Sequence, residues 1–248
     1  MGDKPPSEKS EKDENFKKRG YVIKELISTE KTYLNQLDIV IQVFIDPIRK
    51  EEILDESDIH SQFLNWETIY GLHKHLLEQL TEPLKTNPDD PNAIKVGAIF
   101  KTYSFFLKMY MQYLSNFELA MTRRAEIMCQ NRKFAQLLET ALTDPRCNGS
   151  GIESFLVTPV QRIPRYRMLL QEILKYTPKD YEDYEDLNNS LLKVSEVANA
   201  NNEAIRQREF KDQIMRVMMT IESKSRINLL DEPTRIFKRE ADMFRQCR

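Results

Sequence analysis

Hydrophobic residues recur between Phe16 and Pro47 at steps of three, four or seven positions. They are Ile23, Leu26, Tyr33, Leu37, Ile41 and Phe44. This spacing is typical of an amphipathic α-helix with one apolar face. We expect the helix to end or bend at Pro47, because proline removes a helical hydrogen bond and crowds the preceding turn.

Long proline-poor segments with helical periodicity make up most of the remaining chain. The chain has only six glycines, which disfavours a fold rich in strands and tight turns. The predicted helices span Asp58–Leu80, Ala93–Leu114, Phe117–Leu142, Ile152–Tyr176 and Lys179–Ser223, with Ser115-Asn116 between two of them and a loop at Asp144–Gly151. The pattern predicts an all-α fold, an elongated bundle of about six main helices whose C-terminal helix is longer than average.

The two ends of the chain differ from this helical middle. Residues 1–15 are polar and contain two prolines, so we expect a disordered leader there. Near the other end, Pro233 interrupts the helical pattern, and Arg235–Arg248 is compatible with an extended segment. The expected organisation is a leader at 1–15, a helical domain at 16–223 and a tail at 224–248.

Charge and composition exclude several classes of protein. The chain has 37 basic and 39 acidic residues and a net charge of -2, so it lacks the basic excess of a nucleic-acid-binding protein. No apolar run reaches the roughly 18 residues that a membrane-spanning helix needs. The three cysteines are scattered without CxxC spacing, which indicates reduced thiols in a cytoplasmic protein.

Candidate groups for covalent or metal chemistry are few. The histidines are His60, His73 and His75, and the last two would point in nearly opposite directions on a helix. They are as compatible with a surface as with a core position. The loop at Asn148–Gly151 lacks the lysine of a phosphate-binding loop. We therefore expect no metal, no cofactor and no covalent catalysis.

The segment from Phe155 to Leu170, FLVTPVQRIPRYRMLL, is the most specific in the chain. Its two prolines lie beside an apolar stripe, which by itself indicates a kinked core helix. The stripe consists of Leu156, Val160, Ile163, Leu170 and Ile173, and we expect it in the core. Gln161 and Arg162 are polar among apolar neighbours, so we predict that both tie helices together internally.

This segment resembles the third conserved region of Dbl-homology (DH) domains, the exchange domains of Rho-family guanine nucleotide exchange factors. Residues 25–33, ELISTEKTY, resemble the first conserved region, and residues 197–203, VANANNE, resemble the motif near the end of the last helix. The tail at 229–248 is similar to the linker and first strand of a pleckstrin-homology domain. Asn201, Arg167 and Ala241 depart from the usual family residues.

The resemblance implies a domain that binds a Rho- or Rac-subfamily GTPase, preferentially nucleotide-free, and accelerates GDP release without covalent chemistry. It implies that Glu25 holds switch I, with Thr29 on the same helical face. It places Arg165 and Asn202 against switch II, with Glu209 adding a polar contact on the face of Asn202. Membrane contact would come only through domains absent from this chain, with recruitment of the full protein to the plasma membrane or cortex.

Val157 stands where the family presents an aliphatic side chain to the GTPase strands between the switches. Its small size favours a Rac-like partner with a large aromatic residue there.

Alternatives stay open for each residue: Glu25 as an ordinary exposed acid, Arg165 as a solvated charge, Val157 or Asn202 as internal contacts. For the whole chain, the alternatives are a catalytically inactive scaffold and a membrane-shaping bundle, which would need a one-sided basic surface.

Overall fold

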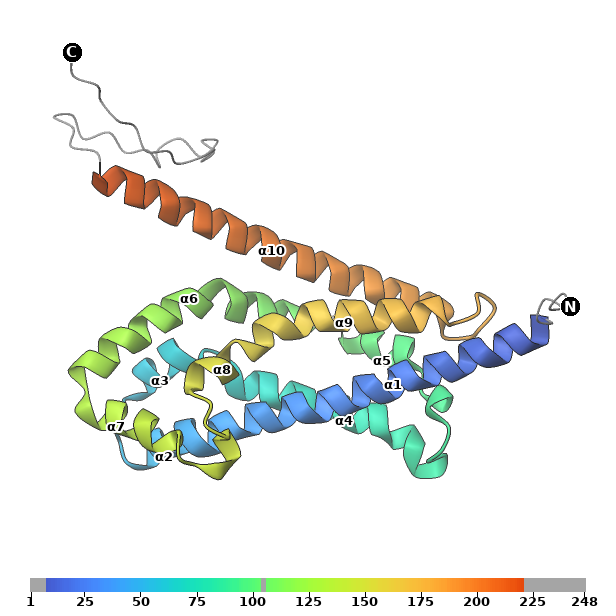
Figure 1. Cartoon of the computed structure of the whole chain (residues 1–248), viewed down its shortest axis with the longest axis horizontal. Helices are drawn as coiled ribbons and strands as arrows, with labels where there is room; N and C mark the ends of the chain where they lie inside the picture. Colours follow the sequence, from blue (N-terminus) through green and yellow to red (C-terminus); the bar gives the residue numbers. More distant parts are fainter. Residues whose placement is uncertain (1–7, 104–105, 221–248) are drawn as a thin grey trace, which may run out of the picture. The chain divides into compact units, whose positions relative to one another are not determined.

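The computed structural model describes residues 8–103 and 106–220, and all regular secondary structure in them is helical. The α-helices are α1 (Glu8–Ile39), α2 (Asp46–Lys50), α3 (Glu56–Phe63), α4 (Trp66–Thr86), α5 (Val96–Tyr103), α6 (Leu107–Gln130), α7 (Arg132–Ala141), α8 (Ile152–Leu156), α9 (Thr158–Lys175) and α10 (Tyr184–Thr220). A π-helix, η1 (Val40–Ile45), and two short 3₁₀ turns, η2 (Pro91–Ala93) and η3 (Pro145–Cys147), connect them (Figure 1). The all-α prediction is confirmed.

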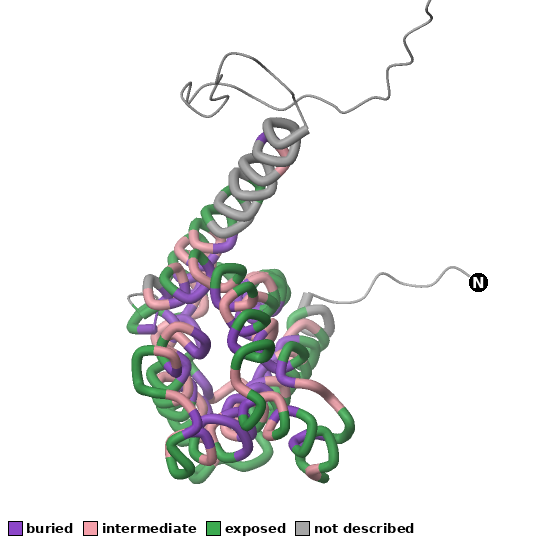
Figure 2. The backbone as a smooth tube through the Cα atoms, turned by 90° about the vertical axis from the view of Figure 1, so that its left-hand side faces the viewer, coloured by how far each residue is buried: buried purple, intermediate pink, exposed green. Residues whose placement is uncertain are grey.

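The chain divides into two compact units within α10, between Asn199 and Ala200. In the first unit, α1 packs against α4 and α9, and α6 packs against α3, α7 and α9. The buried residues of this unit line the space between its helices, while the exposed ones face outward (Figure 2). The first unit is therefore a helical bundle around α1.

The apolar stripe of α1 forms the centre of this core. Ile23, Leu26 and Leu37 are fully buried, as the hydrophobic pattern predicts. Trp66, at the start of α4, is also fully buried, and its indole N–H donates to the carbonyl of Leu37 at 3.0 Å. Burial of a large aromatic side chain with its polar atom satisfied fixes α4 against α1.

The first helix is longer than the sequence pattern predicts. It begins at Glu8, within the range 1–15 that the sequence pattern assigns to the leader. At the other end, α1 stops at Ile39, before Pro47, and the helical path continues through η1 into α2 with Pro47 in its first turn. The wider π turn before the proline relieves the crowding that an α-helical turn would impose.

Several predicted helix boundaries are wrong, and the segment Ala93–Leu114, expected as one helix, is divided between η2, α5 and the start of α6. The segment Asp58–Leu80 is not one helix, because the chain turns at Leu64 (φ 55°), so that α3 packs on α6 and α4 on α1. Conversely, α6 continues through Ser115-Asn116, whose side chains donate to carbonyls one turn earlier. Such local bonds satisfy polar side chains within a helix. The break comes instead at Asn131, whose side chain caps α7 by accepting from the amide of Phe134.

Helices α8 and α9 replace the predicted helix Ile152–Tyr176, with the junction at Val157. Pro159 lies in the first turn of α9, where a missing amide proton costs nothing, and Pro164 lies inside the helix. The last helix, α10, falls within the predicted range of 179–223. The expected tail at 224–248, and its likeness to a pleckstrin-homology strand, lie outside the described residues.

Candidate functional site

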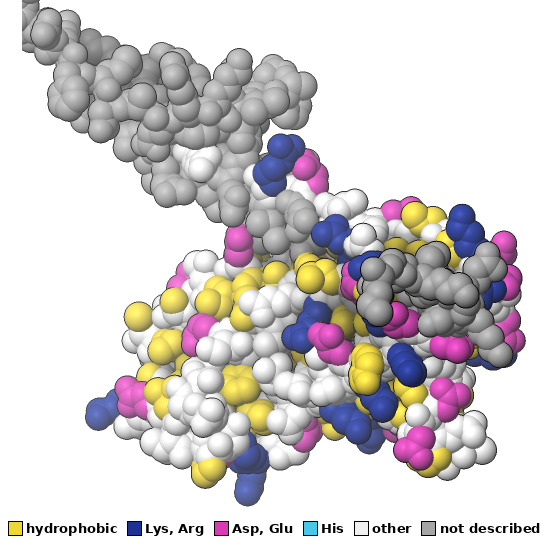
Figure 3. All heavy atoms as spheres, turned by 45° about the vertical axis from the view of Figure 1, so that its right-hand side comes forward, with side chains coloured by type: hydrophobic (Ala, Val, Ile, Leu, Met, Phe, Trp, Pro, Cys, Tyr) yellow, Lys and Arg dark blue, Asp and Glu magenta, His cyan; other side chains and the backbone are white. Residues whose placement is uncertain are grey.

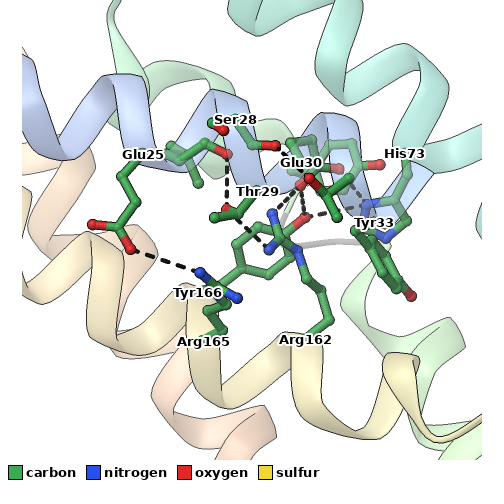
Figure 4. Close-up of polar contacts among 12 residues, drawn as sticks. Glu25, Ser28, Thr29, Glu30, Tyr33, His73, Arg162, Arg165 and Tyr166 are labelled. Atoms are coloured by element: carbon green, nitrogen blue, oxygen red, sulfur yellow. Dashed lines mark hydrogen bonds and ion pairs between the residues drawn. The ribbon is translucent and has the colours of Figure 1, made fainter. Parts of the chain in front are cut away.

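Two parallel rows of polar side chains face each other where α1 and α9 pack side by side (Figure 4). On the surface, the guanidinium of Arg165 lies 3.7 Å from the carboxylate of Glu25, with 52% and 57% of the side chains exposed. An ion pair this exposed contributes little to stability. Both groups are therefore available to a partner at small cost to the fold.

Thr29 lies one turn from Glu25 and is half-buried between the two helices. Its hydroxyl donates to the carbonyl of Leu26 at 3.1 Å and accepts from Nη1 of Arg162 at 3.2 Å. Arg162 is buried, and its other terminal nitrogen pairs with Glu30. The prediction that Arg162 ties the helices together is confirmed.

Behind Thr29 lies a buried polar network that joins α1, α4, α6 and α9. Glu30 accepts hydrogen bonds from Arg162 and from the phenol of Tyr166, and its other oxygen lies 2.6 Å from Nδ1 of His73. Nε2 of His73 is hydrogen-bonded in turn to the hydroxyl of Tyr110. The network therefore holds the carboxylate of Glu30 inside the bundle, with hydrogen-bonding partners from α4 and α9.

The electrostatics of Glu30 follow from these contacts. Burial by itself would raise its pKa, but the attraction of His73 and Arg162 outweighs burial and lowers the pKa from 4.5 to about 2. Glu30 is therefore ionised at neutral pH although it is fully buried. Burial raises the pKa of the Tyr166 phenol, which keeps it protonated as a donor to Glu30.

Between the two helices the surface is hollowed into a groove of about 330 Å³, which we call the α1–α9 groove. Its lining includes Thr29, Thr32 and Gln36 from α1 and Thr158, Gln161 and Arg165 from α9. The Glu25–Arg165 pair lies at its edge. The groove is thus continuous with the residues expected to contact a GTPase.

The structure brings together three of the six predicted contact residues, Glu25, Thr29 and Arg165. Val157 is half-buried at the junction of α8 and α9. Asn202 and Glu209 belong to α10 within the second unit, and their side chains lie outside the described residues.

The prediction for Gln161 is wrong, because this residue is exposed and lines the groove instead of tying helices together. Sequence reasoning also missed Glu30 and His73. Glu30 lies three positions before Tyr33 within the first motif, yet Glu25 nearby has the same chemistry and is exposed. For His73, surface and core positions were equally open, and the structure places it in the core while His75 is exposed. Nothing in the spacing distinguishes these cases, because the deciding partners come from other helices.

On the face shown in Figure 3, lysine and arginine side chains are interspersed with aspartate and glutamate, without a one-sided basic surface. Among the described residues, no cluster of three or more potential metal ligands occurs, and no helix is long and apolar enough to cross a membrane.

Comparison with known proteins identifies the family. The profile of the RhoGEF domain matches residues 22–202, a range that contains Glu25, Thr29, Val157, Arg165 and Asn202. This chain belongs to the RhoGEF domain family. The resemblance of its motifs to DH domains is thereby confirmed.

Relatives of this RhoGEF domain are much longer proteins. Myosin-M heavy chain of Dictyostelium discoideum is 35% identical over 225 residues, which cover 90% of this chain and 12% of that protein. Guanine exchange factor for Rac 30, from the same organism, is 32% identical over 226 residues, covering 91% of this chain and 13% of that protein. The chain thus spans only a small part of the length of these relatives.

Solved structures agree with the assignment. A structure of Vav1 matches with 28% identity and a TM-score of 0.71, covering 84% of this chain and 52% of that one. The DH/PH domains of PDZ-RhoGEF, solved with GTP-γ-S-activated RhoA, share the fold at 18% identity, with a TM-score of 0.71 and coverage of 85% and 60%.

Proposed function

We propose that this RhoGEF domain accelerates GDP release from a Rho-family GTPase by binding its two switch regions. The observation that carries the proposal is the cluster of exposed Glu25 and Arg165 with half-buried Thr29 on two adjacent helices, at positions where the resemblance to DH domains implies GTPase contact. Charged groups at an exposed, weakly paired site can form hydrogen bonds to a partner without first being released from the core.

The mechanism we propose is one of differential binding. Glu25 would hold switch I away from the nucleotide, and Arg165 would engage switch II together with Asn202 and Glu209 of α10. A domain that binds the nucleotide-free GTPase more tightly than the nucleotide-bound form must, by linkage, weaken nucleotide affinity by the same factor. No bond is made or broken, so the absence of a nucleophile–base set in the sequence is consistent with this function.

We propose a GTPase of the Rac subfamily as the preferred partner. The small Val157 leaves room for a bulky partner residue, and shape contacts of this kind discriminate by about 10–200-fold per methylene. Two relatives, Guanine exchange factor for Rac 30 and Rac guanine nucleotide exchange factor B, carry Rac in their names. In the cell we expect the protein in the cytoplasm, recruited to the membrane by other domains.

The proposal is tested by release of fluorescent GDP from a panel of Rho- and Rac-subfamily GTPases. We expect substoichiometric amounts of this domain to accelerate release from at least one member, with Rac-subfamily members fastest. We also expect capture of a GTPase in EDTA, which removes magnesium and nucleotide, but not in excess GDP and magnesium. If the domain captured a GTPase without accelerating GDP release, the exchange proposal would be wrong and the domain would be an inactive scaffold.

A further inference from the structure

Helices α8 and α9 meet at Val157, and backbone hydrogen bonds alone do not hold this junction. Pro159 has no amide proton to donate to the carbonyl of Phe155, four residues earlier. The hydroxyl of Thr158 donates to that carbonyl instead, at 2.6 Å. The geometry of the junction therefore depends on side-chain donors as well as on the backbone.

The next carbonyl, that of Leu156, receives a side-chain donor from another helix. Tyr113 of α6 donates from its hydroxyl to this carbonyl at 2.7 Å, in a hydrogen bond that is buried. Because a peptide group is planar, the carbonyl of Leu156 and the amide of Val157 turn together. A donor that fixes this carbonyl therefore also fixes the direction in which the Val157 side chain leaves the backbone.

Tyr113 is itself held firmly in the core. It is 1% exposed, and the centroid of its ring lies 5.9 Å from those of Trp66 and Phe117. Burial raises the pKa of the Tyr113 phenol, so the hydroxyl keeps its proton and remains a donor at neutral pH. The packed ring thus ties the junction of α8 and α9 to α6.

We propose that Tyr113 is a positioning residue for partner choice, which orients Val157 through the carbonyl of Leu156. The inference rests on the proposed exchange function, in which the size of Val157 selects the GTPase. Selection by shape is sensitive to small displacements, because the supporting residues have to hold a binding side chain within about 0.5 Å of its productive place. Since Tyr113 is buried, it acts through Val157 and not by touching the partner.

Tyr113→Phe tests this role, because it removes the hydroxyl and keeps the packed ring. GDP release from one Rac-subfamily and one Rho-subfamily GTPase would be measured with each full-length variant of this chain. The readout is the ratio of the two kcat/KM values. We expect Tyr113→Phe to change this ratio by at least about threefold, a part of the roughly 10–200-fold that one methylene contributes to discrimination.

A double-mutant cycle with Val157→Ala separates positioning from general support of the fold. Val157→Ala alone should change the ratio, because it removes the side chain that Tyr113 orients. In the Val157→Ala background, Tyr113→Phe should change the ratio no further, since coupled residues give non-additive effects. A change of the same size in both backgrounds would overturn the inference.

Tyr103→Phe is the matched control. Tyr103 is also a buried tyrosine whose hydroxyl donates to a backbone carbonyl, that of Leu72 in α4. Its loss may lower the melting temperature as that of Tyr113 does, but it should leave the ratio unchanged. If Tyr113→Phe slowed both GTPases by the same factor, the positioning role would be wrong and the exchange function would stand. If the unaltered domain accelerated release from no GTPase, both would be wrong.

Discussion

Glu25 and Glu30 lie little more than one turn apart on α1, yet their environments are opposite. The Glu25 side chain is 57% exposed and meets Arg165 at 3.7 Å, whereas Glu30 is fully buried among Arg162, His73 and Tyr166. The same residue type therefore has two different roles on one helix. Glu25 is available to a partner, and Glu30 holds the helices that carry Glu25 and Arg165.

At Glu25 we expect Glu25→Ala to slow GDP release by at least about tenfold, because loss of a charge-assisted hydrogen bond costs roughly 1.5–3 kcal/mol. The melting temperature should hardly change, since exposed substitutions usually shift stability by less than about 0.5 kcal/mol. Exchange assays and thermal unfolding would be measured in parallel.

Glu14→Ala is the control for this prediction, because Glu14 is an exposed glutamate on the same helix in an ion pair with Lys18. It should affect neither exchange nor melting. A large melting shift in Glu25→Ala would show that Glu25 supports the fold and that its assignment as a contact residue is wrong.

At the scale of elements, α5 and the start of α10 approach so closely that a side chain would not fit between them. The carboxylate of Asp183 accepts from the amides of Gly97 at 2.8 Å and Ala98 at 3.0 Å, capping α5 from another segment. A Cβ atom on Gly97 would lie 2.3 Å from the backbone nitrogen of Leu187. Glycine at this position is what allows α10 to begin against α5.

Gly97→Ala should therefore destabilise the protein, since overpacking against rigid backbone costs about 1–3 kcal/mol or more. Gly71→Ala is the matched control, because Gly71 also lies inside a helix but has nothing within 4 Å of the added Cβ. There we expect a gain of about 0.5–1 kcal/mol from helix propensity. Urea unfolding of both variants would measure the two effects, and equal stability would refute the close approach of α5 and α10.

At the scale of the whole molecule, the buried carboxylate of Glu30 makes stability depend on pH. The pKa of Glu30 is about 2 in the folded protein, against an ordinary value of 4.5. Its contribution to the free energy of unfolding is therefore fully present above about pH 4.5 and is lost as pH falls toward 2. A difference of this size corresponds to a stability loss on the order of 3 kcal/mol. Burial raises the pKa of Asp183, which acts in the opposite sense.

The prediction is a steep fall in the free energy of unfolding between pH 5 and about pH 2, measured by urea denaturation. Glu30→Gln should be less stable at neutral pH and should show a shallower dependence on pH. Leu170→Ala controls for destabilisation alone: Leu170 is fully buried, and the cavity should cost about 2–5 kcal/mol without changing the pH dependence. If the free energy of unfolding of Glu30→Gln depended on pH as steeply as that of the wild type, the acid sensitivity would come from other groups.

The sequence by itself determined the all-helical class, the core face of α1 and the family to which the chain belongs. These features follow from local rules, because helical periodicity and breakers such as Pro159 act within a few residues of the chain. The spacing likewise placed Glu25 and Thr29 on one face of α1, since residues one turn apart share a helical face whatever surrounds them.

Only the tertiary structure decided what these side chains contact. Gln161 and Arg162 are adjacent in one motif, but α1 packs over the second alone, so one is exposed and the other is buried in an ion pair. His73 entered the core because Glu30 and Tyr110 arrive from two other helices. Whether a side chain is buried, and which residue it pairs with, depends on neighbours that are distant in sequence and packed close in space. Periodicity and spacing along the chain therefore cannot predict them.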